Sequence, residues 1–214
     1  MKKISIISFL IIATAFQFTA CKSETKKEES KEETKEVITE VKKSTAPFAV
    51  ANAKNDINFT AYKTTEKIGV GGAFKKIDIL SGGEGNSVKE AMNNTEFSIP
   101  VSSLATKDSS RDFKIRKFFF GAMEDTKLLT GKLLLTTDTD GIAKITMNGQ
   151  TEDVLFTYTI VDKTFNMKAT IDVNNWNAGK ALASLNEVCK ILHTGGDGVS
   201  KTWSEVALNI TTTF

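Results

Sequence analysis

The sequence predicts an all-β domain with two short helices, built from about eight antiparallel strands. Apolar and polar residues alternate over several short segments, most clearly from Phe165 to Val173. This alternation is typical of a strand with one buried face and one wet face. Turn sequences rich in Asp, Asn and Gly separate the segments, as at residues 138–141 and 148–149. A helical repeat of apolar residues occurs in only two places.

The alternating segments predict, in chain order, strands at residues 57–62, 69–79, 97–101, 129–136, 143–148, 154–160, 165–173 and 206–210. Gly69, Gly71 and Gly72 lie in the second segment and suggest a bend or bulge there. Eight antiparallel strands close naturally into a barrel, whose interior either packs solid or holds one small ligand. A sandwich of two sheets has the same alternation, so the pattern alone leaves both architectures open.

The predicted helices cover residues 111–120 and 181–193. The first follows residues 108–110, which are typical helix-start residues, and it ends in three phenylalanines, residues 118–120. These rings must be buried, so we expect the helix to act as a plug or gate at one end or side of the barrel. Arg111 is expected to anchor it, or alternatively to contact a polar ligand head group. The apolar stripe of the second helix consists of Ala181, Leu182, Leu185, Val188, Cys189 and Leu192.

The first residues are typical of an export signal. Lys2 and Lys3 precede an uncharged, largely apolar run that ends at Ala20. The sequence Phe-Thr-Ala-Cys at residues 18–21 resembles the lipobox of bacterial lipoproteins, which predicts lipidation of Cys21; the alternative is an ordinary secretory signal that leaves Cys21 as a free thiol. The expected organisation is a lipoprotein signal peptide at residues 1–20, a Lys/Glu-rich tether at residues 21–46 and a barrel domain at residues 47–214.

These segments predict an exported lipoprotein of the cell envelope, held at the membrane by its N-terminal lipid. No Asp follows Cys21 directly, which favours the outer membrane. Without Lys2 and Lys3 the chain keeps 26 of its 28 basic residues against 26 acidic ones, a balance that argues against a nucleic-acid partner. An oligomer is possible but nothing indicates one. Cys189 is the only other cysteine, so an intramolecular disulfide within the domain is not expected.

The sequence contains no persuasive catalytic constellation. His193 is the only histidine, and it follows Cys189 by four residues, which places both on one face of a helix. Two ligands are too few for a metal site. We therefore expect Cys189 to pack in the apolar stripe and His193 to cap the helix C-terminus, where a cation is favoured. The prediction is that the protein is not an enzyme and has no metal or cofactor.

Four features, in order, resemble the YceI-like family of exported bacterial proteins. They are the segment from Ile57 to Ile79, a second segment around residues 103–119, a hairpin around residues 149–156 and the alternating final strand. The residues that carry the middle two are Ser103, Leu104, Thr106, Arg111, Asp112, Phe118 and Phe119, then Gly149, Thr151, Val154 and Phe156. The chain departs from the family pattern at residues 121–133, which lack a proline, and at residues 173–198.

The resemblance implies an extended lipocalin-like barrel whose apolar tunnel holds a long isoprenoid or another lipid chain. The residues expected to line it are Phe59, Phe74, Ile99, Phe119, Leu133, Ile145, Met147, Phe156, Tyr158, Met167 and Ile171. The expected function is to sequester or transport that lipid, which is bound without a covalent bond. The alternative is that the same side chains fill the barrel, and that the protein is a tethered interaction module with no ligand.

Overall fold

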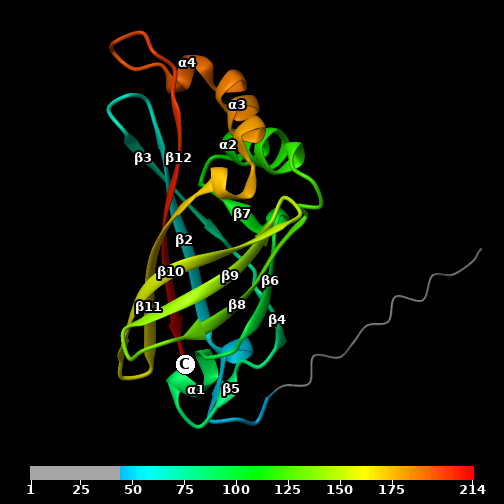
Figure 1. Ribbon diagram of the computed structural model, residues 1–214, viewed down its shortest axis with the longest axis vertical. Coiled ribbons are helices and arrows are strands. Elements are labelled where there is room, and N and C mark those ends of the chain that lie inside the picture. The colour runs from blue at the N-terminus through cyan, green and yellow to red at the C-terminus, as the bar shows by residue number, and fades with distance from the viewer. Residues whose placement is uncertain (1–43) are drawn as a thin grey trace, which may run out of the picture. The chain divides into compact units, whose positions relative to one another are not determined.

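A curled antiparallel sheet dominates the structure (Figure 1). The computed structural model describes residues 44–214. Residues 1–43 lie outside the described part, so the predicted signal peptide, Cys21 and most of the predicted tether are not tested by it. The described residues confirm a mostly β fold with four short helices, α1 to α4.

The main sheet has ten strands in the order β4-β6-β8-β9-β10-β11-β12-β2-β3-β7. Their bounds are β2 Lys54–Lys63, β3 Ile68–Phe74, β4 Asp78–Ser81, β6 Glu96–Pro100, β7 Leu104–Ala105, β8 Leu128–Leu135, β9 Asp140–Met147, β10 Gln150–Val161, β11 Thr164–Asp172 and β12 Thr202–Thr213. Every pairing between neighbours is antiparallel.

The two edges of this sheet meet at one seam. β4 continues β3 along the chain, and β7 continues β6 after a 3-10 turn, η2 (Val101–Ser103). Phe74 pairs with Leu104 on one side of the turn, and Ile79 pairs with Phe97 on the other. Because the same two chain segments pair twice, the curled sheet forms a barrel-like shell of eight strand segments, which is one of the two architectures that the alternation leaves open.

Of the bend or bulge predicted at Gly69, Gly71 and Gly72, the bulge is wrong. β3 pairs with β2 without interruption from Ile68 to Phe74. Gly72 lies directly opposite Phe59, and a Cβ atom at Gly72 would overlap the Phe59 ring. The glycine therefore makes room for an aromatic side chain of the neighbouring strand.

A helical end covers one mouth of the shell (Figure 1). It contains α2 (Ser109–Lys114), α3 (Gly179–Val188) and α4 (Lys190–His193), with the β2–β3 turn beside them. We use "helical end" for residues 63–68, 106–119 and 179–201. At the opposite end lie α1 (Val88–Met92) and a small two-stranded sheet formed by β1 (Phe48–Ala49) and β5 (Glu84–Gly85).

The first predicted helix is confirmed with a change of form. Asp108 caps α2 by accepting a hydrogen bond from the Arg111 backbone N–H at 3.0 Å. The chain then continues as a π-helical segment, η3 (Ile115–Phe119), and a 3-10 turn, η4 (Phe120–Ala122). The second predicted helix is divided into α3 and α4 at Cys189.

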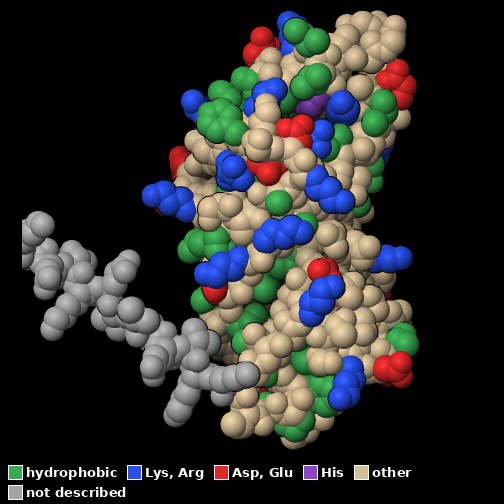
Figure 2. Space-filling model, turned by 180° about the vertical axis from the view of Figure 1, so that it is seen from behind, with side chains coloured by type: hydrophobic (Ala, Val, Ile, Leu, Met, Phe, Trp, Pro, Cys, Tyr) green, Lys and Arg blue, Asp and Glu red, His purple; other side chains and the backbone are tan. Residues whose placement is uncertain are grey.

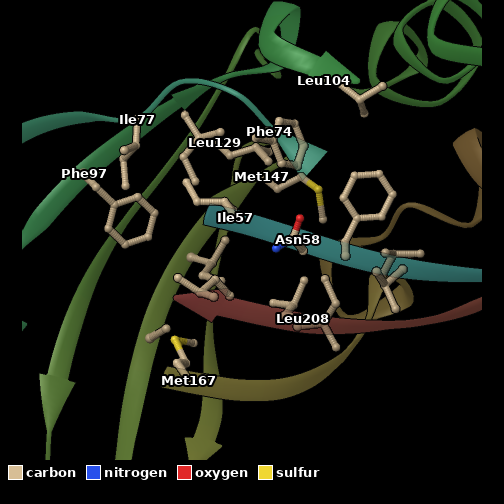
Figure 3. A pocket seen from close by; sticks show the side chains of 18 of the residues that line it. Ile57, Asn58, Phe74, Ile77, Phe97, Leu104, Leu129, Met147, Met167 and Leu208 are labelled. Atoms are coloured by element: carbon tan, nitrogen blue, oxygen red, sulfur yellow. The ribbon is translucent and has the colours of Figure 1, made fainter. Parts of the chain in front are cut away.

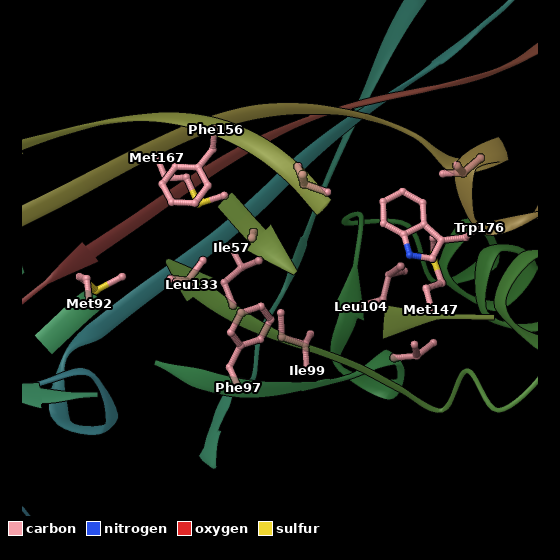
Figure 4. Close-up of a cluster of buried hydrophobic side chains, with 14 of the residues drawn as sticks. Ile57, Met92, Phe97, Ile99, Leu104, Leu133, Met147, Phe156, Met167 and Trp176 are labelled. Carbon is pink, nitrogen blue, oxygen red and sulfur yellow. The ribbon is translucent and has the colours of Figure 1, made fainter. Parts of the chain in front are cut away.

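The buried core extends along the inner face of the sheet and under α3 (Figure 4). Trp176 and Phe165 are among its most deeply buried side chains. The Trp176 indole N–H donates to the Ile145 carbonyl at 2.9 Å, so its one polar group is satisfied.

Candidate functional site

The interior of the shell contains an apolar cavity of about 220 Å³ (Figure 3). It extends from residues near α1, such as Met92 and Thr95, to residues of the helical end, such as Leu182 and Leu185. Its walls come from β2, β3, β4, β6, β7, β8, β9, β11 and β12. An interior packed solid by its own side chains, the alternative considered above, does not match this structure.

Three cross-strand pairs place a phenylalanine ring over a glycine, and two of these rings, Phe59 and Phe97, form part of the cavity wall. Phe59 lies opposite Gly72, Phe97 opposite Gly131, and Phe156 opposite Gly141. In each pair a Cβ atom on the glycine would meet the ring of its partner. A ring that covers a glycine occupies space at the sheet, so it leaves the centre of the shell less filled than an inward-pointing ring would.

A row of aromatic rings joins the sheet to the helical end. The ring centroids are 5.7 Å apart for Phe59 and Phe74, 6.2 Å for Phe74 and Phe120, and 5.1 Å for Phe120 and Phe119. Phe119 and Phe120 are buried and line the cavity. Phe118 instead packs edge to face against the exposed Phe113 on the outer side. The expectation that the phenylalanine cluster enters the barrel therefore holds for two of its three rings.

The contacts that hold this helix are not the predicted ones. The Arg111 guanidinium lies 3.7 Å from Asp108, within the same helix start. Arg116 makes the contact with the sheet, because its Nη1 donates to the Leu104 carbonyl at 3.0 Å. Asp112 adds a second, accepting from the Thr106 backbone N–H at 2.7 Å and from its hydroxyl at 2.6 Å. The anchoring arginine is one helical turn further along than the sequence suggested.

Most of the side chains predicted to line the tunnel do face the cavity. They are Phe59, Phe74, Ile99, Phe119, Leu133, Ile145, Met147, Met167 and Ile171. The structure places Phe156 and Tyr158 elsewhere, in a ring cluster with Phe165. The Tyr158 hydroxyl donates to the Thr137 carbonyl at 2.7 Å, which satisfies it away from the cavity.

Further lining residues were not singled out from the sequence. Ile57, Phe97, Val206 and Ile210 lie on the predicted apolar faces of their strands, so the alternation contained the signal for them. Leu182 and Leu185 belong to the apolar stripe of α3 in the same way. Ile115 depends on how the helical segment turns, which no periodicity shows. Phe120, which also lines the cavity, is one of the three rings that the sequence predicts to be buried in the barrel.

Polar groups at the α1 end of the cavity are bonded to the protein. Asn55 Nδ2 donates to the Val50 carbonyl at 2.9 Å, and the Thr212 hydroxyl donates to Asn55 Oδ1 at 2.8 Å. The Thr95 hydroxyl donates to the Ala91 carbonyl at 2.6 Å. With these donors used, this part of the wall favours an apolar occupant over a polar one.

The pair Cys189 and His193 lies at the junction of α3 and α4. Burial raises the pKa of the Cys189 thiol, which keeps it protonated, and the thiol packs in the helix stripe as expected. Burial, then Lys63, Lys114 and Arg111, lowers the pKa of His193. Desolvation and three nearby cations thus disfavour the charged form that was expected at the helix end.

His193 takes part in a small polar network instead. Its Nδ1 lies 2.6 Å from the Thr202 hydroxyl, which donates to Asn186 Oδ1 at 2.8 Å. Within residues 44–214, no three His, Cys, Asp or Glu side chains are arranged to hold a metal ion. In the same part of the chain, no helix is long and apolar enough to span a bilayer.

An antiparallel barrel-like shell around an apolar cavity defines a lipocalin-like protein. Residues 48–214 match the YceI-like domain, and the chain belongs to this family. No curated protein matches the sequence.

Solved structures of low sequence identity resemble this chain, and the first of the following shares its fold. A polyisoprenoid binding domain from Saccharophagus degradans, implicated in plant cell wall breakdown, superposes with a TM-score of 0.53 at 12% identity, over 77% of this chain and 93% of that one. BcnA of Burkholderia cenocepacia has a TM-score of 0.49 at 17% identity, and the match covers 77% of this chain and 98% of BcnA. The YCEI protein of Campylobacter jejuni has a TM-score of 0.43 at 18% identity, and the match covers 65% of this chain and 84% of that one.

Proposed function

We propose that this protein binds one long apolar chain, an isoprenoid or a similar lipid, inside the cavity. The observation that carries the proposal is the continuous apolar lining from the α1 end to the helical end. The S. degradans neighbour, described as a polyisoprenoid binding domain, supports the same ligand class. Binding in this cavity uses no covalent or catalytic step, and nothing in the proposal requires a cofactor.

The size of the cavity favours a slender ligand. Its volume of about 220 Å³ is below the ~300–1,000 Å³ of pockets that hold drug-sized molecules. A single extended chain uses such a space better than a bulky ring system does.

Burial of that chain supplies the binding free energy. Each buried CH₂ group contributes about 0.8 kcal/mol, so several isoprene units bind tightly without a specific polar contact. The ligand is selected by shape and apolarity, which is consistent with a wall whose polar groups are already bonded.

The chain is further proposed to be an exported lipoprotein held in the envelope by Cys21. The lipobox-like sequence at residues 18–21 and the Lys/Glu-rich segment after it support this. In a detergent phase-partition assay of expressing cells, the wild-type chain is expected in the detergent phase and Cys21→Ser in the aqueous phase. Partition of both chains into the aqueous phase would refute the anchor and leave the cavity proposal standing.

The lipid proposal is tested by extraction and by filling the cavity. Mass spectrometry of an organic extract of the purified protein is expected to show an isoprenoid or a similar long-chain lipid. Ala61 of β2 lines the cavity, so Ala61→Phe is expected to remove most of the bound lipid. Ala207 lies on the adjacent strand but is not part of the lining, so Ala207→Phe is the matched control.

Thermal stability gives a second measurement of the same proposal. A ligand at about 100 times its Kd stabilises the native state by about 2.7 kcal/mol, so adding an isoprenoid alcohol to the delipidated protein should raise its Tm. Ala61→Phe should abolish this increase and Ala207→Phe should keep it. A delipidated wild-type protein whose Tm does not respond to any long-chain lipid would overturn the proposal.

A further inference from the structure

The helical end carries an unequal share of the charge of the domain. Residues 44–214 contain 19 Lys and Arg against 19 Asp and Glu, so the domain as a whole is balanced. The helical end contains ten of these cations and five of the acids. The rest of the domain consequently holds nine cations and fourteen acids. The molecule is therefore polarised, with its positive end where the helices are.

Most of the acids at this end are engaged in local structure. Asp108 caps α2, Asp112 bonds Thr106, and Asp197 accepts from the Thr65 hydroxyl at 2.7 Å. By contrast, Lys114, Lys117 and Lys190 form no ion pair with any of residues 44–214. These lysine ammonium groups are thus free to contact a partner, whereas most of the carboxylates accept hydrogen bonds within the protein.

Exposed apolar side chains lie among these lysines. The large hydrophobic residues exposed at the helical end are Ile68, Phe113, Val188, Ile191, Leu192 and Val199. Ile191 and Leu192 of α4 are 91% and 59% exposed. Figure 2 shows hydrophobic side chains and Lys or Arg side chains intermixed over this end, with some Asp or Glu side chains among them.

The elements that carry these groups pack together, because α3 contacts both η3 and α4. The Lys63 ammonium donates to the Leu192 carbonyl at 2.9 Å, which joins β2 to α4. The Lys117 ammonium lies 5.4 Å from the centroids of both the Phe113 and Phe118 rings. The Lys201 ammonium lies 3.5 Å from the Trp203 ring. Side chains that pair an apolar body with a cation are typical of a surface that meets lipid head groups and acyl chains together.

This surface also lies over one end of the cavity. Leu182 and Leu185 of α3, Ile115 of η3 and Trp203 of β12 line the cavity from the inside. The same elements, or their direct continuations, carry the exposed apolar and basic residues on the outside. A lipid that leaves a bilayer at this surface would have only the helical layer between it and the cavity.

We propose that the helical end is a docking surface for an anionic phospholipid bilayer, on which the protein collects or delivers its lipid. Apolar side chains such as Ile191 and Leu192 insert at the head-group boundary, and Lys114, Lys117 and Lys190 contact anionic phosphates. The transfer role rests on the proposed function, whereas the docking itself is independent of any lipid in the cavity.

Vesicle sedimentation tests the docking directly. The probe is phosphatidylcholine vesicles prepared with and without phosphatidylglycerol. The protein is residues 21–214 carrying Cys21→Ser, so that no covalent lipid contributes to membrane binding. We expect sedimentation with the phosphatidylglycerol vesicles, weaker sedimentation with phosphatidylcholine alone, and a loss of binding as salt is added.

Matched substitutions distinguish binding through this surface from nonspecific adsorption of the protein to vesicles. Lys117→Glu or Lys190→Glu is expected to lower the partition coefficient at least about fivefold, and Ile191→Asp to lower it comparably. Lys168→Glu on β11 and Leu155→Asp on β10 make the same changes at exposed positions away from the helical end and should leave binding unchanged. Equal losses in the controls, or no binding to anionic vesicles, would overturn the proposal.

The two proposals fail in different ways. A protein that retains lipid but does not sediment with vesicles refutes the docking surface and leaves the proposed function intact. A protein that sediments as expected but holds no lipid supports the docking surface and refutes the lipid cavity.

Discussion

At the scale of single residues, glycines let phenylalanine rings of neighbouring strands lie against the sheet. Gly72, Gly131 and Gly141 each lie under a phenylalanine ring of the next strand. In the sequence, a glycine inside a strand suggests a bulge, and that was the prediction for residues 69–72. The structure shows a different use of the same property, because the missing side chain lets a neighbour's ring lie against the sheet.

Gly141→Ala is predicted to destabilise the protein by about 1–3 kcal/mol, since it overpacks the wall. The new Cβ would meet the Phe156 ring and would lie 2.6 Å from the Leu134 carbonyl oxygen, which as backbone moves only at a cost. Gly71→Ala is the matched control, because the nearest atom to a Cβ there is 4.0 Å away. Urea unfolding of both variants measures the difference, and equal stabilities would show that the contact is relieved without cost.

At the scale of elements, the segment from α2 to η4 shows how a helix is joined to a curled sheet. Asp112 bonds Thr106 before the helix, and Arg116 bonds the end of η2 and the start of β7 through the Leu104 carbonyl. The π-helical turn from Ile115 to Phe119 differs in pitch from the α-helix before it, so it changes which side chains face the cavity. Phe119 and Phe120 then point inward while Phe118 remains with Phe113.

Asp112→Ala is predicted to loosen this element, because the Thr106 N–H and hydroxyl lose their acceptor. The expected cost is about 1.5–3 kcal/mol for bonds to a charged group, with faster amide exchange over residues 106–119 and little change in β10 and β11. Asp112→Asn keeps an acceptor oxygen and should be milder. Hydrogen-exchange mass spectrometry distinguishes the two variants. If Asp112→Asn lost as much protection over residues 106–119 as Asp112→Ala, the charge of Asp112 and not its hydrogen bonds would hold the element.

At the scale of the whole molecule, charge is separated along the barrel while the total is balanced. The chain has one histidine, so His193 is the side chain whose ordinary pKa lies closest to neutrality. It lies at the positive end, close to Lys63, Lys114 and Arg111, and its pKa is below the ordinary 6.5. Between those two pKa values the unfolded chain binds more protons than the native one, so stability rises with pH in that window.

The free energy of unfolding is therefore predicted to be fully maintained above pH 6.5 and to fall as the pH drops below it through the folded pKa. The slope due to this group is at most about 1.4 kcal/mol per pH unit. His193→Gln should flatten that part of the curve, and denaturant titrations at a series of pH values measure both proteins. A wild-type stability that rises on acidification through this window would contradict the assignment.

The sequence by itself determined the strands and their inward faces. Strand alternation has a period of two, so once one face is apolar its residues must point to a common interior. This is why most of the predicted lining, from Phe59 to Ile171, was found on the cavity. The Asp108 cap and the apolar stripe of α3 could be predicted for a similar reason, because each depends only on residues a few positions apart.

The tertiary structure alone decided what depends on contacts between distant segments. Phe156 and Tyr158 have the right period but meet Phe165 instead of open space. Arg116 rather than Arg111 reaches the sheet, because the orientation of the helix is fixed by the seam beside it. The lowered pKa of His193 comes from burial and from cations that lie far away in the sequence. Register between strands also brings together the three glycine–phenylalanine pairs, and two of them, at Phe59 and Phe97, shape the cavity wall.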